Sequence, residues 1–260
     1  MKPSIFVITG AAGGIGKHLA ATLRARGATV VATDLQASDG IRQLDVTKPD
    51  EWARLLDDVV RLHGRIDVLL NVAGYLKPGW AHEMPAVEVD RHFDVNVKGV
   101  VFGTQAAALR MVARGSGHVV NIASLAALMP VPGLALYSAS KYAVRAFSIA
   151  SDRELRPKGV AVSVVCPDAV RTPMLDLQKD YPQAEMTFSG PRVLTVDDVT
   201  RVILERVLQT QPTEVFIPAW RGWAARVGDV FPDFAAMLTP LLKKMGRRHQ
   251  RTYAKELTKE

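Results

Sequence analysis

The sequence predicts an α/β fold in which helices cover both faces of a parallel, seven-stranded, doubly wound sheet. Three observations support this prediction. Short strand-like runs alternate along the chain with longer segments of helical periodicity. These runs are nearly all apolar and lack the alternation of a strand with one solvated face. A glycine-rich stretch joins the first run to the first helical segment, where such folds bind phosphate groups.

The expected strands are short runs bounded by glycine, proline or charged residues. They are Ile5–Thr9, Thr29–Asp34, Ile41–Asp45, Asp67–Asn71, His118–Ala123, Val160–Cys166 and Val215–Pro218. The expected helices lie between them and are Gly16–Arg26, Asp50–His63, Val87–Arg114, Tyr137–Arg156 and Val196–Leu208. No repeat, low-complexity tract or linker interrupts this series. We therefore expect one domain over residues 1–218, with residues 219–260 as an extension of the same domain.

Composition places the chain among globular proteins of the cytoplasm. With 260 residues, 48% of them hydrophobic, it can bury a large core. Met1-Lys2-Pro3 leads directly into the first strand, so no signal peptide is expected. No apolar run reaches the roughly 18 residues of a membrane-spanning helix. The single cysteine, Cys166, lies in an apolar run and permits no internal disulfide, which suits a reducing compartment.

The net charge of +7 is concentrated at the C-terminus. The last twenty residues carry seven cations against Glu256 and Glu260, a local net charge of +5. The cations are Lys243, Lys244, Arg247, Arg248, Arg251, Lys255 and Lys259. The rest of the chain is close to neutral, so the composition argues against a nucleic-acid-binding protein and indicates a basic tail.

The glycine-rich stretch has the features of a phosphate-binding loop. It runs Thr9-Gly10-Ala11-Ala12-Gly13-Gly14-Ile15-Gly16 and opens a helix, where backbone N–H groups can approach a pyrophosphate. Asp34 ends the second strand, where a carboxylate accepts hydrogen bonds from ribose hydroxyls. At about 4 Å and an effective dielectric of about 20, it would repel each charge of a 2′-phosphate by about 4 kcal/mol. NAD is therefore favoured over NADP; the alternative is a purely structural turn.

Tyr137 and Lys141 are candidates for proton transfer. They lie four residues apart on an expected helix and therefore project from one face. A phenol has a pKa of about 10, and a nearby ammonium would lower that pKa. Ser124, thirteen residues upstream, completes the candidate set. The spacing also occurs by chance, so a surface tyrosine beside a solvated lysine is the alternative.

Several motifs in order resemble the short-chain dehydrogenase/reductase family over about Ser4 to Pro218. The glycine loop is similar to the family's cofactor loop, Asp45-Val46 to its adenine-contacting pair, and Asn71-Val72-Ala73-Gly74 to its Asn-Asn-Ala-Gly. Asn96, Ser124, Tyr137 and Lys141 match its catalytic set. The cofactor residues that the resemblance implies are Gly10, Ala12, Gly13, Gly14, Ile15, Gly16, Asp34, Leu35, Asp45, Val46, Asn71, Ala73, Gly74, Tyr137, Lys141, Pro167, Asp168, Val170 and Thr172. No metal site is expected.

The resemblance also implies roles. Tyr137 would exchange a proton with the substrate oxygen, and Lys141 would lower its pKa and bind the nicotinamide ribose. Ser124 would hold the substrate oxygen, and Asn96 would support a water that relays protons from Lys141. Each of Ser124 and Asn96 also has a structural alternative, as a turn cap or a helix interruption.

Two residues depart from the family pattern. Val72 replaces an asparagine and removes one side-chain hydrogen bond near the cofactor. Asp168 replaces the glycine of a Pro-Gly pair after the sixth strand. Aspartate tolerates unusual backbone angles, so the turn is expected to survive. We expect the Asp168 charge to touch the substrate or to favour the cationic NAD⁺ ring.

The expected substrate-binding segments are apolar. Leu125–Leu136 carries no charged or hydrogen-bonding side chain. Residues of about 171–195 resemble the family's mobile lid and contribute Met174, Leu175, Leu177, Tyr181, Met186 and Phe188. A lipophilic alcohol or ketone of steroid, retinoid or fatty-chain type is favoured. Ordinary apolar packing of these loops is the alternative.

The C-terminal segment carries an apolar stripe. Its members recur every three or four residues and are Trp220, Trp223, Val227, Val230, Phe234, Met237 and Leu241. Pro232 and Pro240 are expected to break the helix into shorter pieces. With the basic run that follows, the stripe suits the surface of an anionic membrane, its own domain or another subunit. The resemblance implies a homodimer or homotetramer built on Val97–Arg114 and Tyr137–Arg156.

Three functions remain open at this point. The leading one is an NAD-dependent dehydrogenase acting on a small-molecule alcohol or ketone. The second is an NADPH-dependent ketone or 3-oxoacyl reductase, which Asp34 disfavours. The third is a catalytically silent NAD-binding regulatory or scaffold protein, which the intact set of Ser124, Tyr137, Lys141 and Asn96 disfavours.

Overall fold

The strands form one parallel sheet of seven, as the sequence predicts. The computed structural model describes residues 4–258, so Lys259 and Glu260 of the basic tail lie outside it, as do residues 1–3. The strand order is β3-β2-β1-β4-β5-β6-β7, and every neighbouring pair is parallel. The strands are β1 Ile5–Thr9, β2 Thr29–Asp34, β3 Ile41–Gln43, β4 Val68–Asn71, β5 Gly117–Ile122, β6 Val160–Pro167 and β7 Glu214–Ile217. The predicted bounds differ from these by at most two residues.

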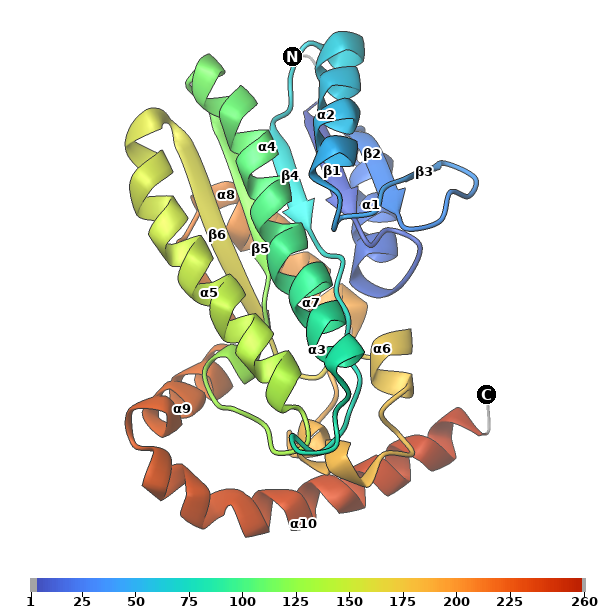
Figure 1. Cartoon of the computed structure of the whole chain (residues 1–260), viewed down its shortest axis with the longest axis vertical. Helices are drawn as coiled ribbons and strands as arrows, with labels where there is room; N and C mark the ends of the chain where they lie inside the picture. Colours follow the sequence, from blue (N-terminus) through green and yellow to red (C-terminus); the bar gives the residue numbers. More distant parts are fainter. Residues whose placement is uncertain (1–3, 259–260) are drawn as a thin grey trace.

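Helices cover both faces of the sheet. Figure 1 shows α4 and α5 side by side in front of the strands, and α2 packs against α4 on this face. On the other face α1 packs against α7. The α-helices are α1 Gly14–Ala25, α2 Pro49–His63, α3 Ala86–Phe93, α4 Gly99–Arg114, α5 Ala135–Leu155, α6 Pro173–Asp176, α7 Val196–Val202, α8 Leu208–Thr210, α9 Ala219–Val230 and α10 Pro232–Leu257. A π-helical turn, Asp94–Lys98, joins α3 to α4, so the predicted helix Val87–Arg114 is continuous but locally widened.

The core follows from the two-residue period of the strands. In β1, Phe6 and Ile8 face the layer of α1 and α7, whereas Ile5 and Val7 face the layer of α2 and α4. Both sets are buried, which explains why the strand sequences are apolar without alternation. Trp52 of α2 is fully buried against the strand residues that face α2 and α4. Cys166 is a buried free thiol between the sheet and α5, as predicted.

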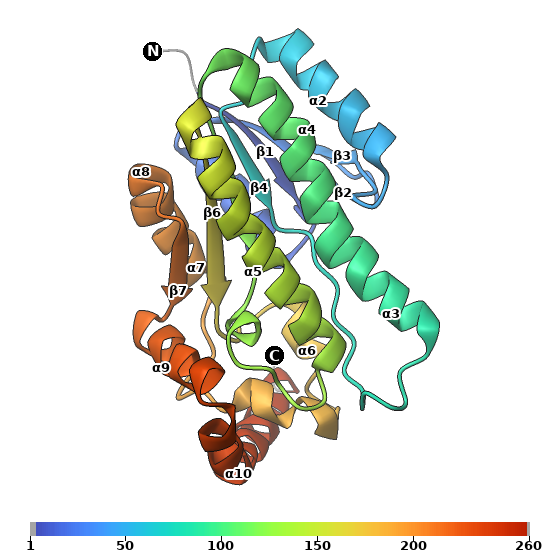
Figure 2. The same ribbon diagram turned by 60° about the vertical axis from the view of Figure 1, so that its left-hand side comes forward.

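All strands end at the same edge of the sheet, and the loops that follow them meet there. The order reverses between β1 and β4, so their two C-terminal loops diverge and leave a crevice, the usual ligand site of an open α/β sheet. Figure 2 shows the arrowheads of β6 and β7 directed toward α9 and α10, which lie across this edge. The C-terminal extension therefore closes the side of the molecule on which the crevice opens.

The predicted effect of the two C-terminal prolines is only partly right. Pro232 occupies the first turn of α10, a position that needs no N–H donor. Pro240 lies inside the 26-residue α10 and does not end it, contrary to the prediction. Both Pro240 and Ala236, whose carbonyl loses its partner, are exposed, so water can satisfy that carbonyl. No helix among residues 4–258 is long and apolar enough to cross a membrane.

Candidate active site

A cavity of about 680 Å³ occupies the C-terminal edge of the sheet. The loops after β1, β2, β4, β5 and β6 form its inner part, and the lid, α9 and α10 form its outer part. The predicted site residues that line it are Gly10, Gly13, Gly14, Ile15, Asp34, Leu35, Val46, Ala73, Gly74, Ser124, Tyr137, Lys141, Pro167, Asp168, Val170 and Thr172. One continuous cavity thus joins the predicted cofactor and catalytic residues.

The glycine loop at the start of α1 fits a bound pyrophosphate. Gly10 and Gly14 have φ angles of +67° and +49°, which favour glycine. A Cβ at Gly16 would lie 2.2 Å from the carbonyl oxygen of Gly10, so this glycine permits close helix–strand packing. A Cβ at Gly13 would meet no protein atom within 4 Å. Gly13 is the N-cap and no side chain caps the helix, so the first-turn N–H groups face open space suited to an anion.

Asp34 is held rigidly at the rim of this loop. One carboxylate oxygen accepts the N–H of Ala12 at 2.9 Å, and the other accepts the N–H of Leu35 at 2.7 Å. The carboxylate therefore faces the cavity at a fixed position beside the glycine loop. Lys17, the first cation after the loop, is exposed on α1 and does not line the cavity. The residues present fit a dinucleotide and place one negative charge, that of Asp34, where its ribose would lie.

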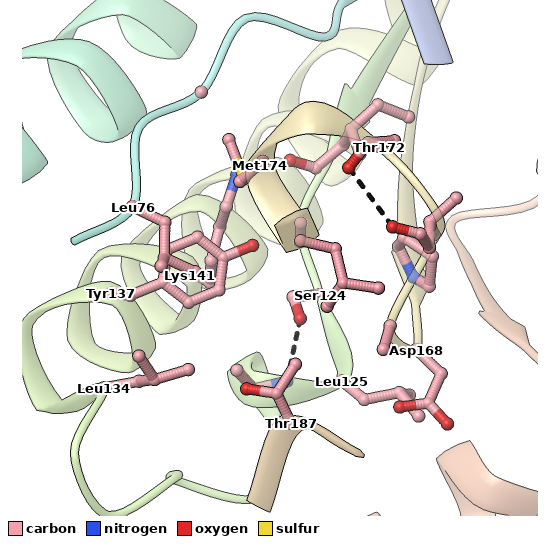
Figure 3. A pocket seen from close by; sticks show the side chains of 18 of the residues that line it. Leu76, Ser124, Leu125, Leu134, Tyr137, Lys141, Asp168, Thr172, Met174 and Thr187 are labelled. Atoms are coloured by element: carbon pink, nitrogen blue, oxygen red, sulfur yellow. Dashed lines mark hydrogen bonds between the residues drawn. The ribbon is translucent and has the colours of Figure 1, made fainter. Parts of the chain in front are cut away.

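Ser124, Tyr137 and Lys141 meet at one end of the cavity (Figure 3). Ser124 follows β5, and its Oγ accepts the N–H of Ala126 at 3.1 Å, so the residue also caps a short turn. Lys141 is only 4% exposed, and its Nζ donates to the carbonyl oxygen of Ile122 at 2.9 Å. Nζ lies 5.6 Å from the centre of the Tyr137 ring. The surface-pair alternative is therefore excluded, because both side chains belong to the cavity.

The pKa of Tyr137 in the folded protein differs from the expectation. Burial raises the pKa of Tyr137 to about 12, and a hydrogen bond with Ser124 opposes that rise. Burial also lowers the pKa of Lys141 to about 8. The predicted lowering of the Tyr137 pKa by the lysine is thus wrong for the protein alone, because desolvation of the phenol outweighs a cation beyond hydrogen-bond range.

Asn96, one of the two predicted asparagines, hydrogen-bonds to groups of the protein itself. Asn96 lies in the π-helical turn, donates to the carbonyl oxygen of Tyr75 and to Ser140 Oγ, both at 2.9 Å, and accepts the N–H of Tyr75 at 2.7 Å. A Cβ on Gly74 would lie 3.4 Å from Asn96 Oδ1 and 3.7 Å from Lys141 Nζ, so Asn96 and Lys141 flank the same glycine. Only one lone pair of Asn96 Oδ1 remains for a water.

Five predicted residues do not line the cavity: Ala12, Gly16, Asp45, Asn71 and Asn96. Ala12 and Gly16 shape the glycine loop through their backbones. Asp45 accepts the N–H and the hydroxyl of Thr47 at 2.9 and 2.7 Å, so its carboxylate is used within its own turn. Asn71 is buried and donates to Asn121 at 2.8 Å, so its side chain is used within the core, and its contact with the cofactor stays a prediction.

Asp168 carries no free charge toward the cavity. Its Oδ2 lies 2.6 Å from Nε of Arg221 in α9, and both side chains are largely buried. Burial raises the pKa of Asp168 above its usual range, and Arg221 opposes that rise. Gly190 of the lid packs against both. The expected contact of this charge with substrate or ring is therefore replaced by an ion pair that joins the loop after β6 to α9.

The outer cavity wall is apolar, as predicted. The segment before α5 contributes Leu125, Ala126, Met129, Val131 and Leu134. Of the named lid residues, Met174, Leu175 and Met186 line the cavity, while Leu177 and Tyr181 are exposed. The sequence-based prediction missed the C-terminal contribution of Trp220, Arg221, Ala224, Leu238 and Leu242. Trp220 belongs to the predicted apolar stripe, and the others lie next to stripe residues along the chain. The prediction left packing on its own domain open for this stripe but did not connect it with the cavity.

The inner side of α10 fastens the lid. Gln250 Nε2 donates to the carbonyl oxygens of Gln178 and Tyr181 at 2.8 and 2.9 Å. The hydroxyl of Tyr253 donates to Asp176 at 2.6 Å, and Arg247 forms an ion pair with Glu185 at 2.9 Å. The segment predicted to be a mobile lid is therefore tied along its length to the C-terminal helix.

Gly246 is the point of closest approach between α10 and the lid. A Cβ there would lie 2.0 Å from the carbonyl oxygen of Glu185. We expect Gly246→Ala to lower the free energy of unfolding by about 1–3 kcal/mol, a typical overpacking cost. Protease cleavage between residues 177 and 190 should become faster. Gly228→Ala in α9 is the matched control, because its Cβ would meet only side-chain atoms, the Ala235 methyl group at 3.3 Å and Met129 Sδ at 3.6 Å. Equal stability of the two variants would contradict the prediction.

A family model described as short chain dehydrogenase matches residues 4–182. The chain belongs to this family. It is 34% identical over 209 residues to a cyclopentanol dehydrogenase of Comamonas testosteroni, covering 75% of this chain and 84% of that protein. It is 33% identical over 184 residues to a 3-alpha-(or 20-beta)-hydroxysteroid dehydrogenase of Mycobacterium tuberculosis, covering 66% of this chain and 71% of that protein. Among solved structures, ElxO with NADP bound superimposes with a TM-score of 0.74 and 25% identity, over 83% of this chain and 96% of that one.

Proposed function

We propose that this member of the short-chain dehydrogenase family oxidises lipophilic secondary alcohols with NAD⁺, using Tyr137 as the acid–base group. The observation that carries the proposal is the meeting of Ser124, Tyr137 and Lys141 in the cavity that also holds the glycine loop and Asp34. When bound, NAD⁺ would accept a hydride from the alcohol carbon. Everything else in the reaction is assigned to this chain's own side chains.

The proposed roles follow from the contacts of each residue. Ser124 Oγ accepts one N–H, and its hydroxyl hydrogen-bonds Tyr137 in the protein alone. A bound substrate oxygen would accept that proton instead, which would fix the oxygen beside Tyr137. Tyr137 removes the hydroxyl proton during oxidation and returns it during reduction. Lys141 donates one of its three protons to Ile122 and keeps two for the nicotinamide ribose and the proton path. Because burial raises the pKa of Tyr137 to about 12, its function as a base needs the positive charge that a bound NAD⁺ adds.

NAD is the proposed cofactor because of Asp34. The carboxylate is fixed by two backbone N–H groups at the rim of the glycine loop, where a 2′-phosphate would lie beside it. An NADPH-dependent ketone or 3-oxoacyl reductase remains the second candidate, and the NADP bound to ElxO is the observation that favours it. A homodimer or homotetramer through α4 and α5 stays a prediction.

A lipophilic substrate is proposed from the cavity wall. Leucine, methionine, valine and alanine side chains surround the end at which Ser124 and Tyr137 meet. The names of the cyclopentanol and hydroxysteroid dehydrogenases support the same class. In a panel of secondary alcohols with NAD⁺, kcat/KM is expected to be at least about tenfold higher for cyclic or steroid alcohols than for polyols, because each buried CH₂ contributes about 0.8 kcal/mol. Better turnover of polyols would reject this substrate class.

A further inference from the structure

The outward side of α10 carries a row of residues that nothing among residues 4–258 covers. Its members recur at alternating intervals of three and four and are all exposed: Phe234, Met237, Leu241, Lys244, Arg248, Arg251 and Lys255. This spacing places them on one face of the helix. We call this row the outer stripe. Its first half is apolar, with Met237 78% and Leu241 57% exposed, and its second half is basic.

The outer stripe continues onto α9, which packs against α10. Trp220, Trp223, Val227 and Val230 of α9 are each more than half exposed. Figure 1 shows α9 and α10 together along the end of the molecule, outside the lid. Few proteins leave so many large apolar side chains in one contiguous surface without a partner for it.

No acidic side chain of the described part of the chain pairs with the basic half of the outer stripe. Lys244, Arg248, Arg251 and Lys255 lie close enough to line a common surface hollow. None of them forms an ion pair with another residue between 4 and 258, whereas their neighbour Arg247 is paired with Glu185. The outer stripe itself contains no acidic residue. A second copy docked through the same stripe would present the same cations and no acidic row to receive them.

We propose that the outer stripe of α10, with the exposed face of α9, docks on an anionic lipid surface. Apolar side chains would enter the boundary of the acyl chains, and the four cations would lie among the negatively charged headgroups. This partner satisfies both halves of the stripe at once.

Residues beside the outer stripe on the same helices reach the active-site cavity. Leu238 and Leu242, each one residue after a member of the outer stripe, line the cavity, as does Ala224 of α9. Docking would therefore hold the apolar cavity wall next to the lipid phase. A lipophilic substrate could then enter the cavity from the lipid phase. This consequence rests on the proposed function, whereas the docking proposal is independent of it.

The test is co-sedimentation of the full chain with vesicles of phosphatidylcholine, alone or with phosphatidylglycerol. Binding should require the anionic lipid and weaken at high salt. Arg248→Gln with Arg251→Gln should lower the partition coefficient about fivefold for each cation removed. Arg26→Gln with Lys158→Gln, a pair of exposed cations elsewhere, should leave it unchanged.

The apolar half is tested by Met237→Ser with Leu241→Ser. This pair should lower binding at least about tenfold, since two buried side chains contribute several kcal/mol to partitioning. Leu62→Ser with Val87→Ser, at 62% and 66% exposure, is the matched control and should bind as the wild type.

Three results would overturn the proposal: no sedimentation with either vesicle, equal sedimentation with both, or a serine pair that converts an oligomer to a monomer without affecting lipid binding. The last result would assign the surface to a second copy of the chain. Turnover of a water-soluble alcohol without vesicles is measured in parallel. It should be equal in wild type and serine pair, so failure of docking is distinguishable from failure of the enzymatic proposal.

Discussion

Tyr137→Phe is expected to lower kcat by about 10²–10⁴-fold, the usual contribution of a positioned acid–base group. The variant loses one hydroxyl in the cavity and keeps the ring, so packing against its neighbours should persist. The glycine loop and Asp34 are untouched, so the dissociation constant for NAD should change little. Single-turnover kinetics with a lipophilic alcohol and a fluorescence titration with NADH measure the two quantities separately.

Tyr142→Phe is the matched control for this prediction. Tyr142 lies on the same helix, but its hydroxyl lies within hydrogen-bond distance of two acceptors, Asp229 and the carbonyl oxygen of Leu128, which share its single proton, and it does not line the cavity. This variant should lose stability and retain kcat. If Tyr137→Phe kept more than about a tenth of the wild-type kcat, Tyr137 would have no acid–base role. A wild-type protein that bound NADH but turned over no alcohol or ketone would favour the catalytically silent alternative.

The sequence predicts the sheet well because a buried parallel sheet constrains every strand in the same way. Each central strand must be apolar on both faces, and the runs of this type became β1, β4, β5 and β6; the edge strand β3, with Arg42 and Gln43 exposed, is less constrained. The order of motifs along the chain also locates the cavity, since parallel strands bring their C-terminal loops to one edge. Local spacing was sufficient for Tyr137 and Lys141, which share one helix face.

Directions of side chains and contacts distant in sequence were harder to predict. Asn71 belongs to the predicted motif, but it pairs in register with Asn121, and both side chains face the α4 and α5 layer. Asp168 was expected to carry a charge because its partner, Arg221, lies 53 residues later in a segment with no assigned contacts. The same holds for the lid, whose fastening to α10 depends on Gln250 and Tyr253.

The choice between NAD and NADP depends on the charge of a single side chain. Asp34→Asn keeps the size and one carbonyl acceptor but removes the charge. At about 4 Å and an effective dielectric of about 20, one charge pair is worth about 4 kcal/mol, and solvent at this partly exposed position will reduce that value. We therefore expect the ratio of kcat/KM for NAD to that for NADP to fall about a hundredfold in the variant, mainly through better use of NADP.

Asp39→Asn is the control for Asp34→Asn. Asp39 is an exposed carboxylate five residues later and does not line the cavity, so its neutralisation changes the overall charge equally without altering the ribose site. The cofactor ratio should remain that of the wild type. Two results would contradict the prediction: a wild type that uses both cofactors equally, or an Asp34→Asn variant with an unchanged ratio of kcat/KM for NAD to that for NADP. Either result would mean that the 2′-phosphate does not lie beside this carboxylate. The NADPH-dependent reductase would then become the better proposal, because the electrostatic objection to it rests on Asp34 alone.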